Sequence, residues 1–378
     1  MPASPTNEAT NEPAVAADVE SAGLIHVGDH MPGLRRLRCG RGFRYVTADG
    51  RTVRDRATLN RIRALVIPPA WTEVWIAVQA NGHLQATGRD ARNRKQYRYH
   101  PDFLKARGET KYTHMFVFAR VLPAIRRQVR KDMQRKGLPW EKVVATVVYL
   151  LDKTLIRVGN LDYARQNGSF GLTTLRDRHV AIKGGTLRFE FKGKSGKIWR
   201  LKLGDRRAAR IVKSCQDIPG QHLFQLIDAD GNRRAIGSAD VNAYLREIAG
   251  EEITAKDFRT WAGTVLAAIT LREFEAVDTV AAARRNIRDA IECVASRLGN
   301  TPTICRKCYV HPEILSSYLN GALLIDVERR ATATLGDAGL APEEAAVLAF
   351  LRAGLRREKR RRRRGRGEAT SPPLQRAA

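Results

Sequence analysis

A tyrosine stands among cationic and polar side chains in the stretch of residues 298–312. Arg306 and Lys307 come shortly before Tyr309, so the phenol lies in a positive field. A phenol is a modest nucleophile until cations stabilise its oxyanion, and the same cations attract a phosphate. Thr301 can cap the helix that follows it, and Pro302 would occupy the first position of that helix. The residue types therefore fit attack on a phosphodiester, although most tyrosines serve packing or hydrogen bonding.

The charge of the whole chain points in the same direction. Its 378 residues include 67 Lys and Arg against 39 Asp and Glu, a net charge of +28, and the sequence pI is about 10.6. Such an excess of positive charge is typical of proteins that bind a polyanion, most often nucleic acid. A length of 378 residues allows two domains, each with its own core.

Cysteine usage and hydropathy indicate the cellular compartment of the protein. The five cysteines are an odd number and are scattered along the chain, which indicates a reducing compartment without a disulfide framework. Cys305 and Cys308 form a C-x-x-C pair, but no second pair stands at zinc spacing, so we expect two partly buried thiols. The longest apolar run, residues 143–151, is too short to span a membrane, and no secretory signal opens the chain. We expect a cytoplasmic protein associated with the nucleoid.

The chain divides by composition into four segments. Residues 1–32 contain acids but no Lys or Arg, which predicts a disordered acidic arm. Residues 33–105 are β-rich, with hairpin signals around Asp49-Gly50 (strands 43–47 and 51–53) and Asn81-Gly82 (strands 73–79 and 83–87). Residues 106–335 are mainly helical after a linker near residues 102–112. Residues 336–378 predict a C-terminal helix followed by a disordered basic tail.

The end of the β-rich segment, residues 88–101, is basic and aromatic. Arginines there can grip phosphates, glutamine can read a base edge, and alternate tyrosines lie on one face of an extended strand. The alternative is a charged edge strand that protects a sheet. We favour DNA contact, because aromatic residues are interleaved with the cations. The candidate residues are Arg89, Arg94, Lys95, Gln96, Tyr97 and Tyr99.

The helical segment contains further cations at defined places. A helical stripe over residues 141–156 ends next to Arg157. Thr254 and Asp257 form a capping-box-like start, which puts Arg259 near the positive end of the next helix, where a phosphate is favoured. A hairpin over residues 187–203 carries Lys194 at its tip, and Gly299 stops a helix over residues 277–298.

Four blocks in this order resemble the poxvirus-like type IB DNA topoisomerases, in the form found in bacteria. They are LIRVGN at 155–160, FKGK at 191–194, KDFRTW at 256–261 and CRKCYVHP at 305–312, and the resemblance covers about residues 35–325. It implies an α+β fold: a small β-rich N-terminal domain and a larger, mainly α-helical catalytic domain with a β-hairpin, which together form a clamp around DNA.

The resemblance also implies the roles of the residues. Tyr309 corresponds to the nucleophile that becomes linked to the 3′ phosphate, Arg157 and Arg259 to the arginines that clamp nonbridging oxygens, and Lys194 to the lysine that protonates the departing 5′ oxygen. Asn300 stands where many members carry histidine, so we assign it hydrogen bonding only.

The resemblance further implies that Tyr163 is a DNA-binding residue. We expect neither a metal nor another cofactor, because the sequence holds no carboxylate cluster suited to Mg²⁺ and no Walker-type loop. Duplex DNA is the expected partner. We expect a monomer without membrane association or an obligate protein partner.

Two alternatives remain. A tyrosine recombinase uses the same Arg, Lys, Arg and Tyr chemistry, but Arg259 does not sit in the histidine-containing block typical of recombinases. A noncatalytic architectural DNA-binding protein would also carry this charge, and in it Tyr309 would have no chemical role.

Overall fold

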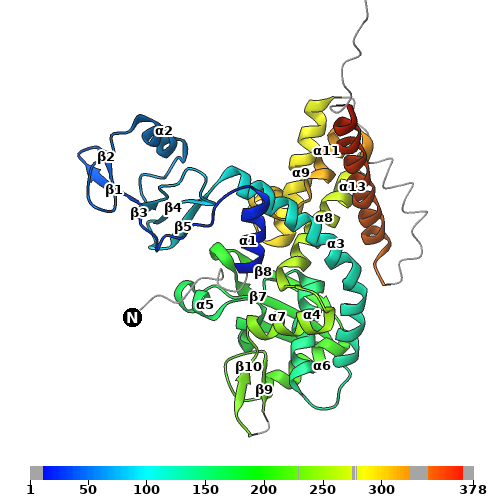
Figure 1. Ribbon diagram of the computed structural model, residues 1–378. Coiled ribbons are helices and arrows are strands. Elements are labelled where there is room, and N and C mark those ends of the chain that lie inside the picture. Colours follow the sequence, from blue (N-terminus) through cyan, green and yellow to red (C-terminus); the bar gives the residue numbers. More distant parts are fainter. Residues whose placement is uncertain (1–11, 229, 275–276, 278, 324–338, 369–378) are drawn as a thin grey trace, which may run out of the picture. The chain divides into compact units, whose positions relative to one another are not determined.

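The computed structural model describes residues 12–228, 230–274, 277, 279–323 and 339–368. The chain folds as two compact units, residues 1–114 and 115–378, and its structure is mixed α+β (Figure 1). The division lies within the long helix α3 (Pro101–Asp132). The linker expected near residues 102–112 is therefore helical. Pro101 suits the first turn, and the fully buried Phe103 ties that turn to the rest of the first unit.

The first unit is built on a five-stranded antiparallel sheet in the order β2-β1-β3-β4-β5. Side chains alternate between its faces: Val74 and Ile76 pack on the face covered by Ile62, whereas Trp75 and Ala77 pack on the other. The bounds of its elements are β1 (Leu34–Cys39), β2 (Gly42–Val46), α2 (Arg56–Ala64), β3 (Thr72–Ile76), β4 (Leu84–Arg89) and β5 (Lys95–Tyr99).

Two expectations for this unit need correction. The first hairpin is formed by β1 and β2, one strand earlier than expected, and the Asp49-Gly50 turn closes only a single bridge between Val46 and Thr52. The described part of the acidic arm is ordered: it includes α1 (Glu12–Ser21), and Val27 packs with Trp75 in the sheet's second core cluster. That segment is apolar enough to cover a sheet face, which its acidic composition concealed. Residues 1–11 lie outside the described residues.

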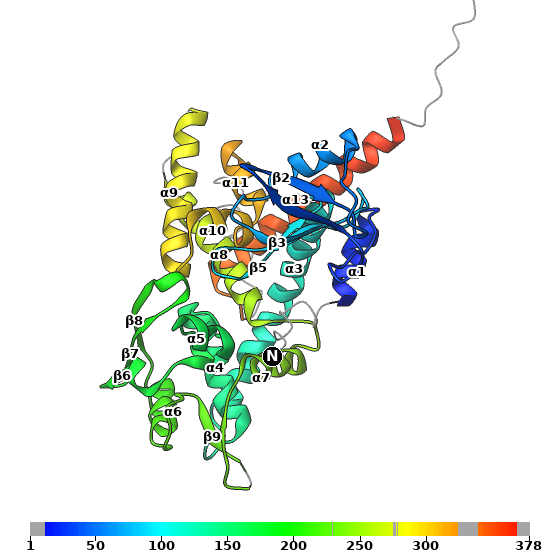
Figure 2. The ribbon, with the colours of Figure 1, turned by 90° about the vertical axis from the view of Figure 1, so that its left-hand side faces the viewer.

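The second unit is mainly helical, with the three-stranded antiparallel sheet β6-β7-β8 on one side (Figure 2). The helix α4 is almost wholly buried, with Val143, Val147 and Leu150 fully inaccessible, and contacts α6, α7 and α8. The bounds of its elements are α4 (Trp140–Thr154), α5 (Leu161–Asn167), β6 (Val180–Lys183), β7 (Thr186–Lys192), β8 (Ile198–Gly204), α6 (Arg206–Gln216), β9 (Gln225–Ile227), β10 (Arg233–Ala235), α7 (Ser238–Ala249), α8 (Ala255–Glu273), α9 (Val280–Leu298), α10 (Pro302–Cys308), α11 (Pro312–Leu319) and α13 (Pro342–Glu368).

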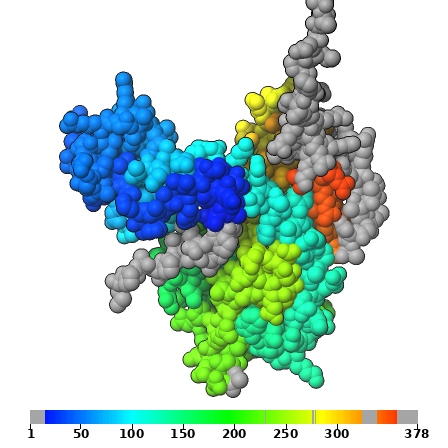
Figure 3. Space-filling view, viewed as in Figure 1, coloured from blue at the N-terminus to red at the C-terminus, as the bar shows by residue number. Residues whose placement is uncertain are grey.

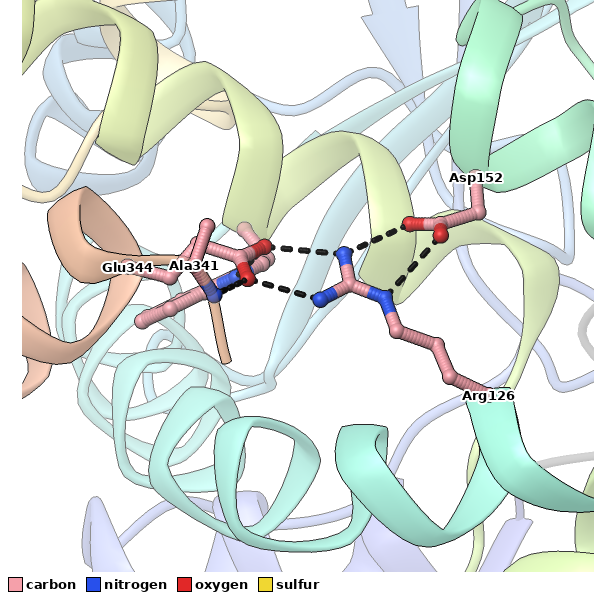
Figure 4. Close-up of polar contacts among 5 residues, drawn as sticks. Arg126, Asp152, Ala341 and Glu344 are labelled. Atoms are coloured by element: carbon pink, nitrogen blue, oxygen red, sulfur yellow. Dashed lines mark hydrogen bonds and ion pairs between the residues drawn. The ribbon is translucent and has the colours of Figure 1, made fainter. Parts of the chain in front are cut away.

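A buried ion network fastens α13 to the second unit (Figure 4). Arg126 of α3 donates to both Asp152 of α4 and Glu344 of α13, at 2.7–3.0 Å, and Glu344 also accepts from the Trp261 indole at 3.0 Å. In Figure 3 the orange-red surface of α13 lies beside the blue-green surface of α3. Burial alone would raise the pKa of Glu344, but hydrogen bonds and charge from Arg126 hold it below its usual value.

The backbone of α13 continues as a helix to Glu368, through most of the arginine run that we expected to be a disordered tail. Arginine is a good helix former, so a helix already anchored at Glu344 can propagate through it. Residues 369–378 lie outside the described residues. No described helix is long and apolar enough to cross a membrane.

Candidate active site

Tyr309 follows directly on the short helix α10. Thr301 caps that helix by accepting from the Ile304 N–H, Pro302 occupies its first position, and the Tyr309 N–H donates to the carbonyl of Cys305 at 2.9 Å. The Tyr309 carbonyl accepts from the Thr264 hydroxyl of α8 at 3.2 Å. The half-buried tyrosine is thus fixed by its backbone while its ring is partly exposed.

Helix α8 approaches Tyr309 more closely than any side chain would permit. A Cβ added at Gly263 would lie 2.8 Å from the Tyr309 carbonyl oxygen and 3.1 Å from its Cβ. Glycine in a helix interior costs roughly 0.5–1 kcal/mol relative to alanine. The close approach accounts for its presence, because it lets α8 carry both a support for Tyr309 and a cation that faces its ring.

That cation is Arg259, whose guanidinium carbon lies 5.3 Å from the centre of the Tyr309 ring. Arg259 occupies the second turn of α8, after the capping box of Thr254 and Asp257 that the sequence predicted. Only 3% of the residue is exposed. Its guanidinium donates to the carbonyls of Leu155 and of Leu298, the latter at 2.6 Å, so two helix ends hold its orientation.

Arg157 reaches the same place from the loop after α4. Leu155 ends α4 in the left-handed conformation (φ 58°), and the loop is then held by the Leu172 N–H, which donates to the Arg157 carbonyl at 2.8 Å. A Cβ at Gly171 would lie 2.6 Å from that carbonyl, so only glycine permits the contact. The Arg157 guanidinium donates to the Gly299 carbonyl at 3.4 Å and to the side-chain oxygen of Asn300.

Among the residues that the structure describes, no carboxylate pairs with either arginine of the cluster. Burial lowers the pKa of both Arg157 and Arg259, and for Arg259 the positive charge of Arg157 lowers it further. Arginine keeps its proton nonetheless. The Nε of Arg259 and the Nδ2 of Asn300 are buried and have no hydrogen-bond partner among the described residues. The Cys305 thiol lies near the Asn300 amide, but sulfur is a weak acceptor. An oxyanion would satisfy both donors and both charges.

Lys194 stands at the tip of the β7–β8 hairpin, as the sequence predicted. Its side chain is exposed, and its ammonium stands 5.8 Å from the centre of the Tyr163 ring of α5. The hairpin therefore presents an ammonium on a flexible side chain, whereas hydrogen bonds hold the two guanidinium groups in fixed orientations.

Known proteins share both units of the chain. Residues 100–323 match the family model of the eukaryotic DNA topoisomerase I catalytic core, and residues 42–90 match that of the bacterial DNA topoisomerase IB N-terminal domain. DNA topoisomerase 1B of Acanthamoeba polyphaga mimivirus is 32% identical over 299 residues, which cover 77% of this chain and 88% of the relative. The chain belongs to the type IB DNA topoisomerases. DNA topoisomerase 1B of vaccinia virus (strain Copenhagen) is 21% identical over 272 residues, covering 69% and 82%.

In this topoisomerase, the candidate DNA-binding cations of the first unit already have acidic partners. Arg89 pairs with Glu73 at 2.8 Å, Arg94 with Asp90 at 2.6 Å, and Lys95 with Asp29 at 2.6 Å. Hydrogen bonds from Arg94 lower the pKa of Asp90 to about 2. DNA phosphates would have to replace these carboxylates. The ion pairs therefore fix the positions of the cations but compete with DNA for them.

The other three candidates of this strand are held within the first unit. Tyr97 and Tyr99 share one face, with stacked rings 5.9 Å apart, as the alternation predicted. Both rings pack against the core cluster around Trp75, so each is only half-exposed. Gln96 donates to Asp90 at 2.9 Å. Their part in DNA binding stays a prediction.

Several residues at the topoisomerase site were missed by sequence reasoning. Gly263 and Thr264 support Tyr309, and the buried Cys305 lies near Asn300 and both arginines; burial raises the pKa of its thiol. An isolated glycine within a helical pattern was a usable signal for Gly263. Cys305 had been interpreted only as a partly buried thiol.

Proposed function

We propose that this chain relaxes supercoiled duplex DNA by cutting and resealing one strand through a covalent bond to Tyr309. The observation that supports it most directly is the buried guanidinium of Arg259 over the Tyr309 ring, with the half-buried Arg157 close enough to add its charge. Beside them, Arg259 Nε and Asn300 Nδ2 are buried donors with no hydrogen-bond partner among the described residues. Such a cage fits a phosphodiester at the moment when it gains negative charge.

In the cleavage step, Tyr309 loses its phenolic proton to water, its oxygen attacks phosphorus, and the bond from phosphorus to the 5′ oxygen breaks. The products are a 3′-phosphotyrosyl link and a free 5′ hydroxyl. Arg157 and Arg259 bind the nonbridging oxygens. Asn300 donates through Nδ2, while its Oδ1 accepts from Arg157. Each preorganised donor is worth roughly 3 kcal/mol of transition-state stabilisation.

Lys194 supplies the proton that the departing 5′ oxygen needs. Its exposed ammonium sits on a hairpin tip and contacts the Tyr163 ring, a cation–π contact worth about 0.5–1 kcal/mol at an exposed site. The approach of DNA can displace so weak a contact. In resealing, the 5′ hydroxyl attacks phosphorus and gives its proton to the Lys194 amine. Tyr309 leaves as a phenolate, which takes a proton from water.

The phosphotyrosyl link conserves the energy of the broken phosphodiester, so resealing requires neither ATP nor a metal ion. Between the two steps, the strand with the free 5′ hydroxyl swivels about the intact strand, driven by torsional strain. The substrate is DNA, because a ribose 2′ hydroxyl beside the linkage would compete as a nucleophile.

The two units close around duplex DNA as a clamp, and the active form is a monomer in the cytoplasm, on the nucleoid, without an obligate protein partner. A net charge of +28 supports the DNA contact. The second unit of one chain contains every residue to which a chemical role is assigned, which supports a monomer: Arg157, Lys194, Arg259, Asn300 and Tyr309.

The test compares wild type with Tyr309→Phe on supercoiled plasmid, in EDTA and without ATP. Wild type should relax the plasmid and form a covalent adduct that survives denaturant; the variant should bind DNA with unchanged affinity but do neither. An inactive wild type would refute the mechanism. Exchange of strands between two defined sites would favour a recombinase, and a variant that matches an equally inactive wild type would favour an architectural protein.

A further inference from the structure

The ring of Trp199 fills the space that two glycines leave open. A Cβ added at Gly193 would lie 2.6 Å from Cδ1 of Trp199, and one added at Gly299 would lie 2.4 Å from its Cζ2. Both distances are below any normal contact, so the indole lies directly against the backbone at both positions. Gly193 belongs to the hairpin and Gly299 to the end of α9, 106 residues later by their numbers.

Each glycine stands next to a residue of the proposed chemistry. Gly193 precedes Lys194, the proposed proton donor. Gly299 precedes Asn300, and its own carbonyl accepts from Arg157 at 3.4 Å. One indole therefore contacts the backbone beside the proton donor and the backbone beside the phosphate clamp.

The hairpin itself holds the indole in place. Trp199 of β8 pairs in register with Phe191 of β7, and their rings stack with centres 6.1 Å apart and planes 3° from parallel. The Gly193 N–H donates to the carbonyl of Lys197 at 2.8 Å and closes the tip. The ring and the tip thus move as one piece, so the contact with Gly299 fixes where that piece docks.

We propose that Trp199 is a positioning residue that docks the β7–β8 hairpin on Gly299, so that Lys194 can reach the departing 5′ oxygen. This inference rests on the proposed function. Trp199 itself touches no reacting atom. Its removal should therefore impair proton delivery to the leaving group and spare phosphate binding by Arg157, Arg259 and Asn300.

A change of leaving group separates these effects. In a substrate whose bridging 5′ oxygen is replaced by sulfur, the leaving thiolate has a far lower pKa than an alkoxide and departs without a proton. We expect Lys194→Ala and Trp199→Ala each to slow single-turnover cleavage of the ordinary substrate by about 100-fold, the scale of general-acid catalysis. On the sulfur substrate, both variants should cleave at a rate within about threefold of the wild-type rate.

Two controls define the signature. Asn300→Ala removes a donor to a nonbridging oxygen, so sulfur should not restore its rate. Ile198→Ala removes an exposed side chain, 52% accessible, from the same strand and should behave as wild type on both substrates. Trp199→Phe keeps an aromatic ring and should fall between wild type and Trp199→Ala.

A second variant, Gly193→Ala, distinguishes a loss of positioning from a loss of folding. Gly193 has φ −93°, an ordinary value, so Gly193→Ala introduces no backbone strain but drives a methyl group against the indole. It should slow the ordinary substrate and be rescued by sulfur, with thermal unfolding like that of wild type. If Lys194→Ala is rescued but Gly193→Ala and Trp199→Ala are not, or if they cleave at the wild-type rate, the positioning role is overturned. If Lys194→Ala itself is not rescued, the proposed acid is wrong.

Discussion

The guanidinium of Arg157 donates a hydrogen bond to the side-chain oxygen of Asn300, although 143 positions separate the two residues. The bond orients the amide so that Nδ2 is its remaining donor. A cationic histidine at this position could not accept this bond and would repel Arg157. The asparagine therefore fits a cage in which one neutral residue links an arginine to the bound phosphate.

Loss of the amide should lower the rate of strand cleavage more than DNA affinity. Asn300→Ala removes one donor and frees Arg157, so we expect a fall of about 100-fold in single-turnover cleavage. Asn300→Asp should be slower still, because a carboxylate pairs with Arg157 and repels the phosphate. Filter binding should give similar affinities for all three proteins. A cleavage rate for Asn300→Ala within twofold of wild type would contradict the assigned hydrogen bond.

A methyl group at Gly263 should disable the tyrosine without unfolding the protein. Gly263→Ala places a Cβ 2.8 Å from the Tyr309 carbonyl oxygen, so α10 must shift and the phenol with it. We expect at least a tenfold fall in the cleavage rate, on the scale of small misplacements of reacting groups. The control is Gly108→Ala in α3, where no described atom outside the neighbouring helix backbone lies within 4 Å of the added Cβ. It should retain full activity and gain about 0.5–1 kcal/mol of stability.

Glu344→Gln should destabilise the protein in a pH-dependent manner. Removal of one charge from the buried pair with Arg126 should lower the free energy of unfolding by about 3 kcal/mol at neutral pH. Because the folded-state pKa of Glu344 lies below its ordinary value of 4.5, this contribution is complete above pH 4.5 and is lost as the pH falls through the folded value. Denaturant titrations at several pH values should therefore show the two proteins converging in acid. The exposed neighbour Glu343, changed to Gln, is the control and should have little effect.

Asp29→Asn should strengthen DNA binding by the first unit. Asp29 pairs with Lys95 at 2.6 Å and accepts from Thr87 at 3.1 Å, and the pairing with Lys95 keeps its pKa low although burial opposes this. Without the carboxylate, Lys95 can bind a phosphate, so the slope of log affinity against log salt should steepen by up to about 1. Asp49→Asn makes the same change of charge beside Arg51, away from β5. Equal effects of the two substitutions would exclude a specific role for Asp29.

The sequence predicted the features that depend on neighbouring residues. The capping box at Thr254 and Asp257, the helix stop at Gly299 and the position of Lys194 on a hairpin tip all follow from local backbone chemistry. Contacts between distant residues leave no such local signal. The structure alone reveals three such contacts: Trp199 against Gly299, Asp29 with Lys95, and α8 against Tyr309.

The site residues were chosen from the family resemblance, because hydrophobic periodicity alone could not identify them. Arg157, Arg259, Asn300 and Tyr309 meet in one cluster, yet nothing in their spacing alone requires it. The extent of α13 was misjudged because a run of like charges in isolation favours an extended chain, whereas a run attached to an anchored helix can continue it.

The anchoring of α13 also sets an order of events during protein synthesis. Glu344 follows Trp261 by 83 residues and Arg126 by 218, and it also follows Tyr309. A nascent chain that already contains the nucleophile therefore still lacks one of the two carboxylates that hold Arg126, together with the acceptor of the Trp261 indole. The ribosome must therefore translate the chain as far as Glu344 before Trp261, on the helix that carries Arg259, gains this acceptor for its indole.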